Sequence, residues 1–374
     1  MNVPLSRLYN FLYQLGDEPK ICFYRFYPHG SKKIEDLSKL LDHGKITHSS
    51  HATFMFCHDQ EPLNWDMYST GPNCQINLRT VLHEYGIKYN HVLLLHSEQH
   101  SPELERYQAS RFIGVYYWSH AIIASDWFRH AKIDPALDQE KTIKHDFLVY
   151  NRAWTGTREY RLKFAELLIE SQLVSNCNTK FNPLDDNKHY ASHVFVNPGL
   201  QISNFGIENI LELNTFDSTA SADYDSDDYN TTAIEVVLET LFDDSRWHLT
   251  EKTLRPIACG QPFMLAATAG SLEYLRSYGF KTFDGLIDES YDQIVDPLSR
   301  LKAIVAEMSR VANLSVDEKH QLYSKLNKIA KFNQQHFFSD EFTTQVLDEY
   351  KSNLKQGLKT ISDSHAKLHN KQAQ

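Results

Sequence analysis

Short apolar runs alternate with helix-like segments along the first half of the chain. Four of these runs end abruptly in polar residues: ICFYRFY (21–27), ATFMFCHDQEP (52–62), HVLLLHSEQHSP (91–102) and HAIIASDWF (120–128). Each run has the length of a buried strand in a parallel sheet. Helix-like stretches lie between them, such as KKIEDLSKLLDHG and the segment from Ser101 to Tyr117. The alternation predicts a doubly wound α/β pattern.

A second alternation begins with the predicted strand HDFLVYNRAW (145–154). The strongly helical TREYRLKFAELLIESQLV follows, and its apolar residues keep helical spacing from Tyr160 to Val174. AIEVVLET (233–240) and QPFMLAA then predict strands on either side of the helix LTEKTLRPIACG. From about Asp296 to Lys359 the chain is nearly all helix-forming, and the last residues are polar and look frayed.

Together these patterns predict an α/β protein with two Rossmann-like domains that face each other across a cleft. The N-terminal domain is expected at residues 1–140 and the second domain at 141–345, followed by a C-terminal helix and polar tail at 346–374. The length of 374 residues suits two domains of ordinary size. The helical extension is expected to pack on the first domain.

Composition and charge narrow the classes of function. The formal net charge of −10 disfavours a surface built to neutralise nucleic-acid phosphates, although a local basic groove stays possible. The five cysteines are scattered and lack metal-ligand spacing, as expected in a reducing compartment. No signal peptide or transmembrane segment is recognisable, so the sequence predicts a cytoplasmic protein, peripheral at the inner membrane surface at most.

Acidic residues follow three of the first-half strands. Ligands of open α/β sheets lie beyond the carboxyl ends of the strands, which makes these acids candidates for catalysis. They are Asp59 and Glu61 after the apolar stretch ATFMFC, Glu98 after HVLLLHS and Asp126 after AIIAS. For any one of them the alternative is a helix cap or an exposed loop residue, so the recurrence across strands is the informative feature.

Basic residues in the second half form a candidate anion site. Thr250 is a predicted helix cap, with Glu251 and Lys252 in the first turn, where backbone N–H groups and the helix dipole favour a diphosphate. Arg255 shares a helix face with Lys252. In NRAWTGTREYR, three arginines follow a buried strand and suggest a phosphate clamp: Arg152, Arg158 and Arg161. Surface salt bridging is the alternative, above all for Arg161.

Other patterns are weaker. The acidic segment SADYDSDDYN contains a D-x-D pattern that can hold a metal–nucleotide pair, but its polar composition favours a solvated loop. The sequence has no convincing zinc, haem or nicotinamide signature and no P-loop. His96 and His100 are interpreted as non-ligands. We therefore expect no metal and no cofactor.

At this point the chain resembles the bacterial and animal α-1,3-fucosyltransferase family. In the second half, Glu239 closes a strand, Thr250-Glu251-Lys252 open a helix, and Gly260 and Pro262 form a turn one residue shorter than the family's G-x-x-P. The spacing of Asn151 and Arg158 also matches. In the first half, HSEQHSP resembles the family's G-E-N-x-S-P around Glu98, and the next predicted strand ends in Asp126. The chain departs from the family at PFMLAATAG and at HDQEP.

The resemblance implies a GT-B fold and an inverting, metal-independent glycosyltransferase. Glu98 would be the general base toward a glycan acceptor, although Glu61 or Asp59 could take that role. Arg158 and Lys252 would bind the diphosphate of a nucleotide-sugar donor, and Glu251 would hold the donor sugar or ribose. Fucose from GDP-fucose is the best single expectation. The alternatives are a DNA-modifying sugar transferase of the same fold and a non-catalytic carbohydrate-binding protein.

Overall fold

The computed structural model describes residues 21–25, 53–57, 60–65, 78–84, 86–203, 206–213 and 222–372. The chain divides into two compact units. The N-terminal unit contains the described residues up to Ile123 together with those from Thr344 onward, and the central unit is Ala124–Thr343. Helices α5 (Ser119–Trp127) and α12 (Asp340–Gln372) both cross a division between the units.

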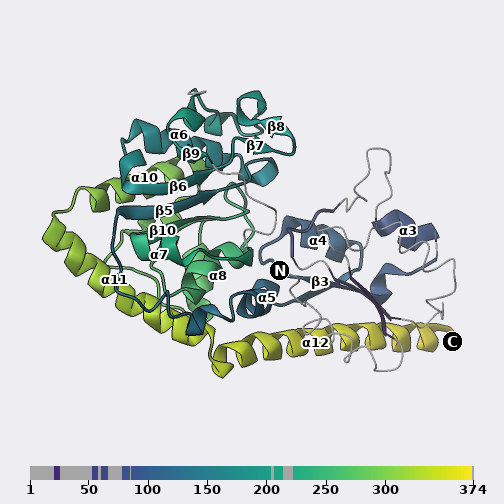
Figure 1. Ribbon diagram of the computed structural model, residues 1–374. Helices are drawn as coiled ribbons and strands as arrows, with labels where there is room; N and C mark the ends of the chain where they lie inside the picture. The colour runs from purple at the N-terminus through teal and green to yellow at the C-terminus, as the bar shows by residue number, and fades with distance from the viewer. Residues whose placement is uncertain are drawn as a thin grey trace. The chain divides into compact units, whose positions relative to one another are not determined.

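The N-terminal unit contains a four-stranded parallel sheet in the order β1-β2-β3-β4 (Figure 1). Its strands are β1 (Ile21–Arg25), β2 (Thr53–Cys57), β3 (Val92–His96) and β4 (Ile113–Tyr116), and its short helices are α3 (Leu78–Glu84) and α4 (Pro102–Ala109). The first three strands confirm the predicted runs. The order in space follows the order in sequence, so these strands contain no reversal of direction along the sheet.

The predicted fourth strand at 120–128 is wrong, because that segment forms helix α5. Strand β4 lies instead inside the segment predicted as one helix from Ser101 to Tyr117. Helix α4 ends early, and Arg111 takes a left-handed conformation (φ 76°) that turns the chain into β4. A short apolar run fits a buried helix as well as a buried strand, and periodicity alone does not separate the two. Asp126 is therefore a helix residue and not a strand end.

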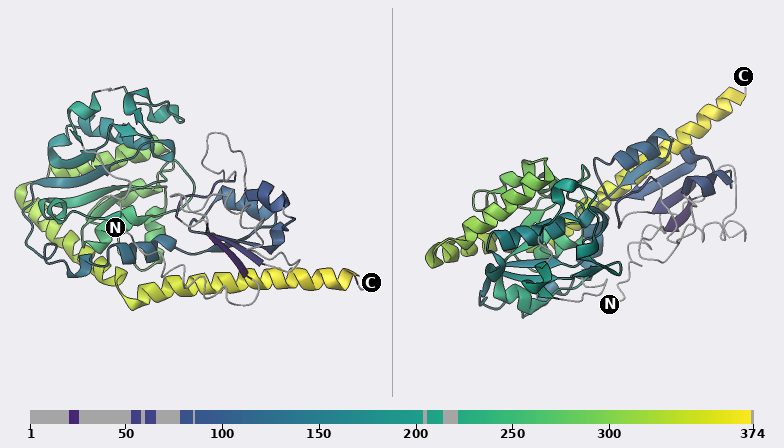
Figure 2. Two further views of the ribbon diagram at one scale, coloured as in Figure 1. Left: turned by 45° about the vertical axis from the view of Figure 1, so that its right-hand side comes forward. Right: turned by 90° about the horizontal axis from the view of Figure 1, so that it is seen from above.

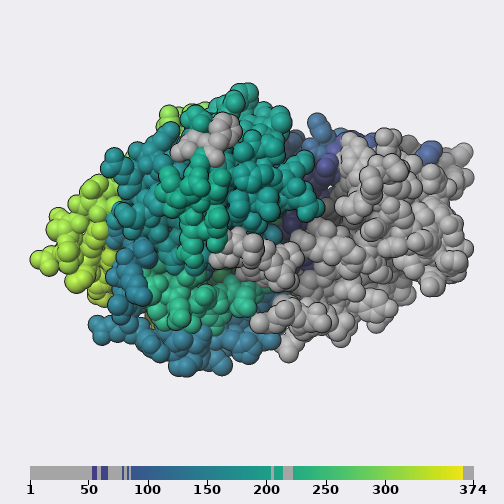
Figure 3. Space-filling model, turned by 45° about the horizontal axis from the view of Figure 1, so that its top comes forward, coloured from purple at the N-terminus to yellow at the C-terminus, as the bar shows by residue number. Residues whose placement is uncertain are grey.

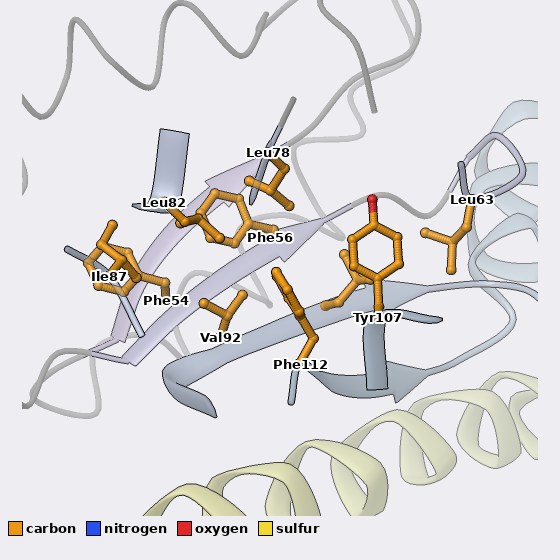
Figure 4. Close-up of a cluster of buried hydrophobic side chains, with 10 residues drawn as sticks. Phe54, Phe56, Leu63, Leu78, Leu82, Ile87, Val92, Tyr107 and Phe112 are labelled. Carbon is orange, nitrogen blue, oxygen red and sulfur yellow. The ribbon is translucent and has the colours of Figure 1, made fainter. Parts of the chain in front are cut away.

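Apolar side chains cover both faces of this sheet. Phe54, Phe56 and Val92 lie on one face in a cluster with α3, α4 and the segment around Leu63 (Figure 4). Helix α12 runs along the other face (Figure 2), where Gly357 allows close approach: a Cβ added there would lie 2.9 Å from Leu93 Cδ2. The expected packing of the C-terminal helix on the first unit is confirmed. The helix also continues to Gln372, past the point where the sequence predicts fraying.

The central unit contains a five-stranded parallel sheet in the order β11-β10-β5-β6-β9. The strands are β5 (His145–Asn151), β6 (Cys177–Phe181), β9 (Glu212–Leu213), β10 (Thr232–Leu238) and β11 (Phe263–Ala266). Strands β5, β10 and β11 confirm predictions, whereas β6 was not predicted. From β5 the chain adds β6 and β9 on one side, then returns to add β10 and β11 on the other. The strand order thus reverses between β5 and β10.

Helices lie on both faces of the central sheet (Figure 1). Helix α6 (Tyr160–Glu170) packs on the face of the sheet that carries Phe181. Helix α8 (Glu251–Ala258) packs on the face that carries Glu235, and Glu235 pairs with Leu148 of β5. Because Phe181 pairs with Asn151 and side chains alternate along β5, these two helices cover opposite faces. The described part of the unit also contains the helices α7 (Ser226–Thr231), α9 (Ser271–Ser277), α10 (Pro297–Ala312) and α11 (Val316–Phe337). Figure 3 shows the teal and green surface formed by the first part of this unit.

A buried acid in the central unit gives a prediction about pH. Asp292 is 3% exposed and accepts a hydrogen bond from Leu272 N at the start of α9 (3.2 Å). Burial raises its pKa from 3.8 to about 6. The folded protein favours the protonated form of Asp292. The contribution of this acid to the free energy of unfolding is therefore fully present below pH 3.8 and is lost as the pH rises through about 6. Asp292→Asn keeps an acceptor oxygen, and we expect it to be more stable than the wild type at pH 7.5, by up to about 3 kcal/mol.

Urea unfolding at pH 7.5 and pH 4.5 tests this prediction. The advantage of Asp292→Asn should shrink as the pH falls, because the wild-type acid then becomes neutral as well. Glu341→Gln removes an exposed acid of α12 and should give no such difference between the two pH values. An equal gap between Asp292→Asn and the wild type at both pH values would contradict the buried, proton-binding carboxyl.

Candidate functional site

A cavity of about 340 Å³ lies in the central unit against β5, β6 and β10. It includes the carboxyl ends of β5 and β10, the point at which the strand order reverses and where ligands of open α/β sheets bind. Five cationic side chains line it: Arg152, Arg161, Lys180, Lys252 and Arg255. Four acids also line it: Asp223, Asp225, Asp228 and Glu235. What the cavity can bind depends on which of these charges are already paired within the protein.

Arg152 follows directly after β5 and offers the cavity a guanidinium. The residue is half-buried, and no hydrogen bond or ion pair joins its side chain to any other residue that the structure describes. Lys252, in the first turn of α8, lines the same cavity. Its Nζ is 2.8 Å from Glu251 Oε1 and 3.2 Å from Thr250 Oγ1, so its charge is partly balanced. Arg152 and Lys252, which were both predicted to bind the donor, therefore line one cavity.

Arg161 has a structural role, and the interpretation as a surface ion pair is wrong. The residue is 2% exposed, and its guanidinium donates to Ala153 O (2.7 Å) after β5 and to Leu238 O (2.6 Å) in β10. It therefore ties together the carboxyl ends of the two strands at the reversal point. Asn151 supports it by donating from Nδ2 to Arg161 O (2.9 Å). Burial lowers the pKa of Arg161, and the backbone carbonyls replace the lost hydration.

Glu239 already fills the anion site expected at the start of α8. Its side chain is fully buried, and its carboxylate accepts hydrogen bonds from the amides of Thr240, Thr250 and Thr253 and from the hydroxyls of the last two. Thr250 is the helix cap, as predicted. The amides of Thr250 and Thr253 thus hold a carboxylate of the protein, and the Lys252 side chain is the part of this turn that reaches the cavity.

The acidic segment is more ordered than the sequence suggests. Asp225 caps helix α7 (Ser226–Thr231) by accepting from Asp227 N (2.9 Å). Asp228 is buried and accepts from Tyr150 Oη (2.7 Å) and Asn178 Nδ2 (2.8 Å). The prediction of a solvated loop is therefore wrong for the second half of this segment, because the polar side chains of β5 and β6 satisfy the Asp228 carboxylate. Across the residues that the structure describes, no group of three His, Cys, Asp or Glu could hold a metal ion.

Arg255 is paired within the protein. Its guanidinium lies 2.5 Å from Glu235 Oε1, and its Cζ lies 4.3 Å from the centre of the Tyr150 ring. Burial alone would lower the pKa of Arg255, but the Glu235 carboxylate raises it well above its ordinary value. Tyr229 Oη donates to Glu235 (2.6 Å) and accepts from Arg255 Nε (3.1 Å). This pair forms a fixed wall of the cavity, so the sharing of phosphate between Arg255 and Lys252 is not supported by the geometry.

Arg158 lies in a short 3-10 turn, Gly156–Arg158, and is absent from the described lining of the cavity. Asp185, a residue that the sequence analysis did not select, accepts hydrogen bonds from the amides of Trp154 and Thr155 directly before this turn. Asp185 belongs to a small antiparallel hairpin, β7 (Leu184–Asp185) and β8 (Lys188–His189). The sequence signal for this hairpin was the turn D-D-N-K, which suits left-handed residues. Tyr150 and Lys180 were also missed, although both lie on strands that end at the cavity.

The candidate acids of the N-terminal unit have different surroundings. Glu98 is 1% exposed, and its carboxylate accepts from Leu63 N (3.3 Å) and from Ser101 Oγ (2.5 Å), the cap of α4. Glu61 is half-buried, and Asp59 lies outside the described residues. Asp126 belongs instead to the central unit, and its Oδ1 lies 3.7 Å from Nη1 of Arg129, two residues past the end of α5. Which carboxylate removes a proton from an acceptor stays a prediction.

No protein-family model matches this sequence, and a search of curated proteins finds no match. Among the described residues, no helix is both long and apolar enough to cross a membrane. Any functional conclusion therefore depends on the geometry of the cavity and its charges.

Proposed function

We propose that the chain is an inverting glycosyltransferase of the GT-B type, built from two Rossmann-like domains. The central unit would bind the nucleotide-sugar donor and the N-terminal unit the acceptor glycan. One observation carries the proposal: a cavity at the reversal point of a parallel sheet places the Arg152 guanidinium and the Lys252 ammonium together. Nucleotide phosphates bind at this position in doubly wound sheets.

The chemistry of glycosyl transfer suits this charge arrangement. As the bond between sugar and diphosphate breaks, negative charge grows on the leaving oxygens. Arg152 and Lys252 would stabilise that charge in a partly desolvated site, where such interactions are stronger than in water. A carboxylate of the N-terminal unit, Glu98, Glu61 or Asp59, would accept the proton of the attacking hydroxyl. GDP-fucose remains the preferred donor through the family resemblance.

Thermal unfolding with a panel of nucleotides and nucleotide sugars tests the donor site. A ligand that binds only the folded protein at 100 times its Kd stabilises it by about 2.7 kcal/mol. We expect GDP or another nucleoside diphosphate to raise the Tm, and Arg152→Ala and Lys252→Ala each to remove most of that increase. Arg158→Ala should have a smaller effect, because Arg158 is absent from the cavity lining.

Lys331→Ala is the matched control, because this exposed lysine pairs with Asp138 at 3.2 Å and is absent from the cavity lining. Its Tm and its response to nucleotide should follow the wild type. If none of the nucleotides changes the Tm of the wild type, the donor site does not exist and the transferase proposal fails.

The burial of Glu98 favours a second candidate, a carbohydrate-binding protein without catalysis. A base must reach the acceptor hydroxyl, whereas the Glu98 carboxylate already holds Leu63 and Ser101. This candidate predicts glycan binding without consumption of any nucleotide sugar. Release of nucleoside diphosphate from a sugar nucleotide, abolished by Lys252→Ala, would reject it.

A further inference from the structure

The turn that carries Arg152 and Arg158 is held by a carboxylate from a separate part of the chain. Asp185 Oδ2 accepts three hydrogen bonds: from Trp154 N (2.8 Å), Thr155 N (2.7 Å) and Thr155 Oγ1 (2.7 Å). In addition, Trp154 Nε1 donates to Asn182 O (3.1 Å) just before the hairpin. Segment 182–185 therefore fixes both the backbone and the tryptophan ring of the turn between β5 and α6.

The hairpin is built to present this carboxylate. Asp186 and Asn187 both take left-handed conformations, with φ of 49° and 60°, as a two-residue hairpin turn requires. Asp185 pairs with Lys188 across the hairpin, and Tyr190 N donates to Pro183 O (3.0 Å) to close its base. A left-handed backbone is unfavourable for both Asp186 and Asn187. The hairpin that contains these two residues determines the position of Asp185.

The Asp185 carboxylate is ionised under ordinary conditions. Partial burial would raise its pKa, but the hydrogen bonds from Thr155 and Trp154 and the nearby charge of Arg158 lower the pKa below its usual value. The three donors satisfy the charge locally. Because Asp185 is absent from the cavity lining, a phosphate bound beside Arg152 and Lys252 would not meet its carboxylate.

We propose that Asp185 is a positioning residue for phosphate binding, which sets the backbone of the turn from which Arg152 reaches the cavity. The inference depends on the proposed nucleotide site. Among the described residues, none holds the Arg152 side chain itself, so its direction follows from the backbone that carries it. Gly156 (φ 63°) lies in the same turn, and Asp185 is the side chain that bonds two successive amides there.

Calorimetric titration with GDP, guanosine and inorganic pyrophosphate tests the role of Asp185. Asp185→Ala should weaken GDP and pyrophosphate binding by about tenfold or more, since three hydrogen bonds that fix the turn are lost. Guanosine, which lacks phosphate, should bind as in the wild type. Asp185→Asn keeps one acceptor oxygen and should restore part of the phosphate affinity.

Asp186→Asn is the matched control, because its exposed carboxylate lies 3.5 Å from Thr155 Oγ1 and touches no amide of the turn. It should leave all three affinities unchanged. If Asp185→Ala does not fold, Thr155→Val provides a second test. It removes the hydrogen bond from Thr155 Oγ1 to the Asp185 carboxylate, and it should still weaken pyrophosphate binding more than guanosine binding.

The outcomes separate the two proposals. If the wild type binds neither GDP nor pyrophosphate, the proposed nucleotide site fails. If the wild type binds them and both Asp185→Ala and Thr155→Val bind them equally well, the site stands and the positioning role of Asp185 is wrong. Equal weakening of GDP and guanosine would also overturn the inference, because a general loss of structure has no preference for phosphate.

Discussion

Replacing Glu239 with alanine is expected to lower the free energy of unfolding by about 3 to 5 kcal/mol. The variant leaves three amides and two hydroxyls around the start of α8 without their acceptor, in a place where water does not reach the side chain. Because these groups orient the first turn of α8, Lys252 should also lose its position. We therefore expect nucleotide stabilisation to disappear together with the loss in stability.

Urea unfolding of Glu239→Ala, Glu239→Gln and the wild type measures this effect. Glutamine keeps the volume and one acceptor oxygen, so its loss should be smaller than that of alanine. Glu212→Ala is the control. It removes an acid whose side chain is 60% exposed and whose ion pair with Lys180, at 3.5 Å, is long. It should change the free energy of unfolding by less than about 0.5 kcal/mol. A Glu239→Ala protein as stable as this control would show that the carboxylate does not organise α8.

The second large effect is expected at the buried pair of Glu235 and Arg255. Arg255→Met removes the cation and leaves the Glu235 carboxylate in the protein interior, where it still accepts a hydrogen bond from Tyr229 Oη (2.6 Å). Breaking a buried ion pair on one side costs about 3 to 5 kcal/mol, because the other charge stays without compensation. Most of this cost comes from the isolated charge and not from the lost attraction.

A double variant separates these contributions. Glu235→Gln with Arg255→Met removes both charges and keeps an amide oxygen that can accept from Tyr229. We expect it to recover half or more of the stability lost in Arg255→Met, as measured by urea unfolding of both proteins. A double variant that loses the full sum of the Arg255→Met and Glu235→Gln effects would show no energetic coupling between the two side chains and would contradict this prediction.

The sequence located most strands of the fold but not all of them. The apolar runs at β2, β3, β5, β10 and β11 were recognisable, because buried parallel strands are apolar on both faces. Strand β6, CNTKF, was missed because two polar residues break the apolar pattern: Lys180 lines the cavity, and Asn178 donates to Asp228. Helix α5 was misread because HAIIASDWF is apolar on all sides, which describes a buried strand as well as a buried helix.

For the candidate site, residue type was predictable and partnership was not. Arg152, Arg161 and Arg255 look alike in the sequence, as cations close to strand ends or helix starts. In the structure, Arg161 is bound by carbonyls and Arg255 by Glu235, which leaves Arg152 to face the cavity. Asp185 could not be selected at all, because its partners Trp154 and Thr155 lie thirty or so residues earlier in the chain.

The sequence by itself determined the α/β class, most of the parallel strands, the cap of α8 by Thr250 and the concentration of basic residues around two strand ends. These features follow from local patterns of apolar and polar residues. Only the tertiary structure decided the strand order, the reversal between β5 and β10, and which charges are paired. A charge binds a ligand only if no other part of the chain has already neutralised it, and that depends on contacts between segments far apart in sequence.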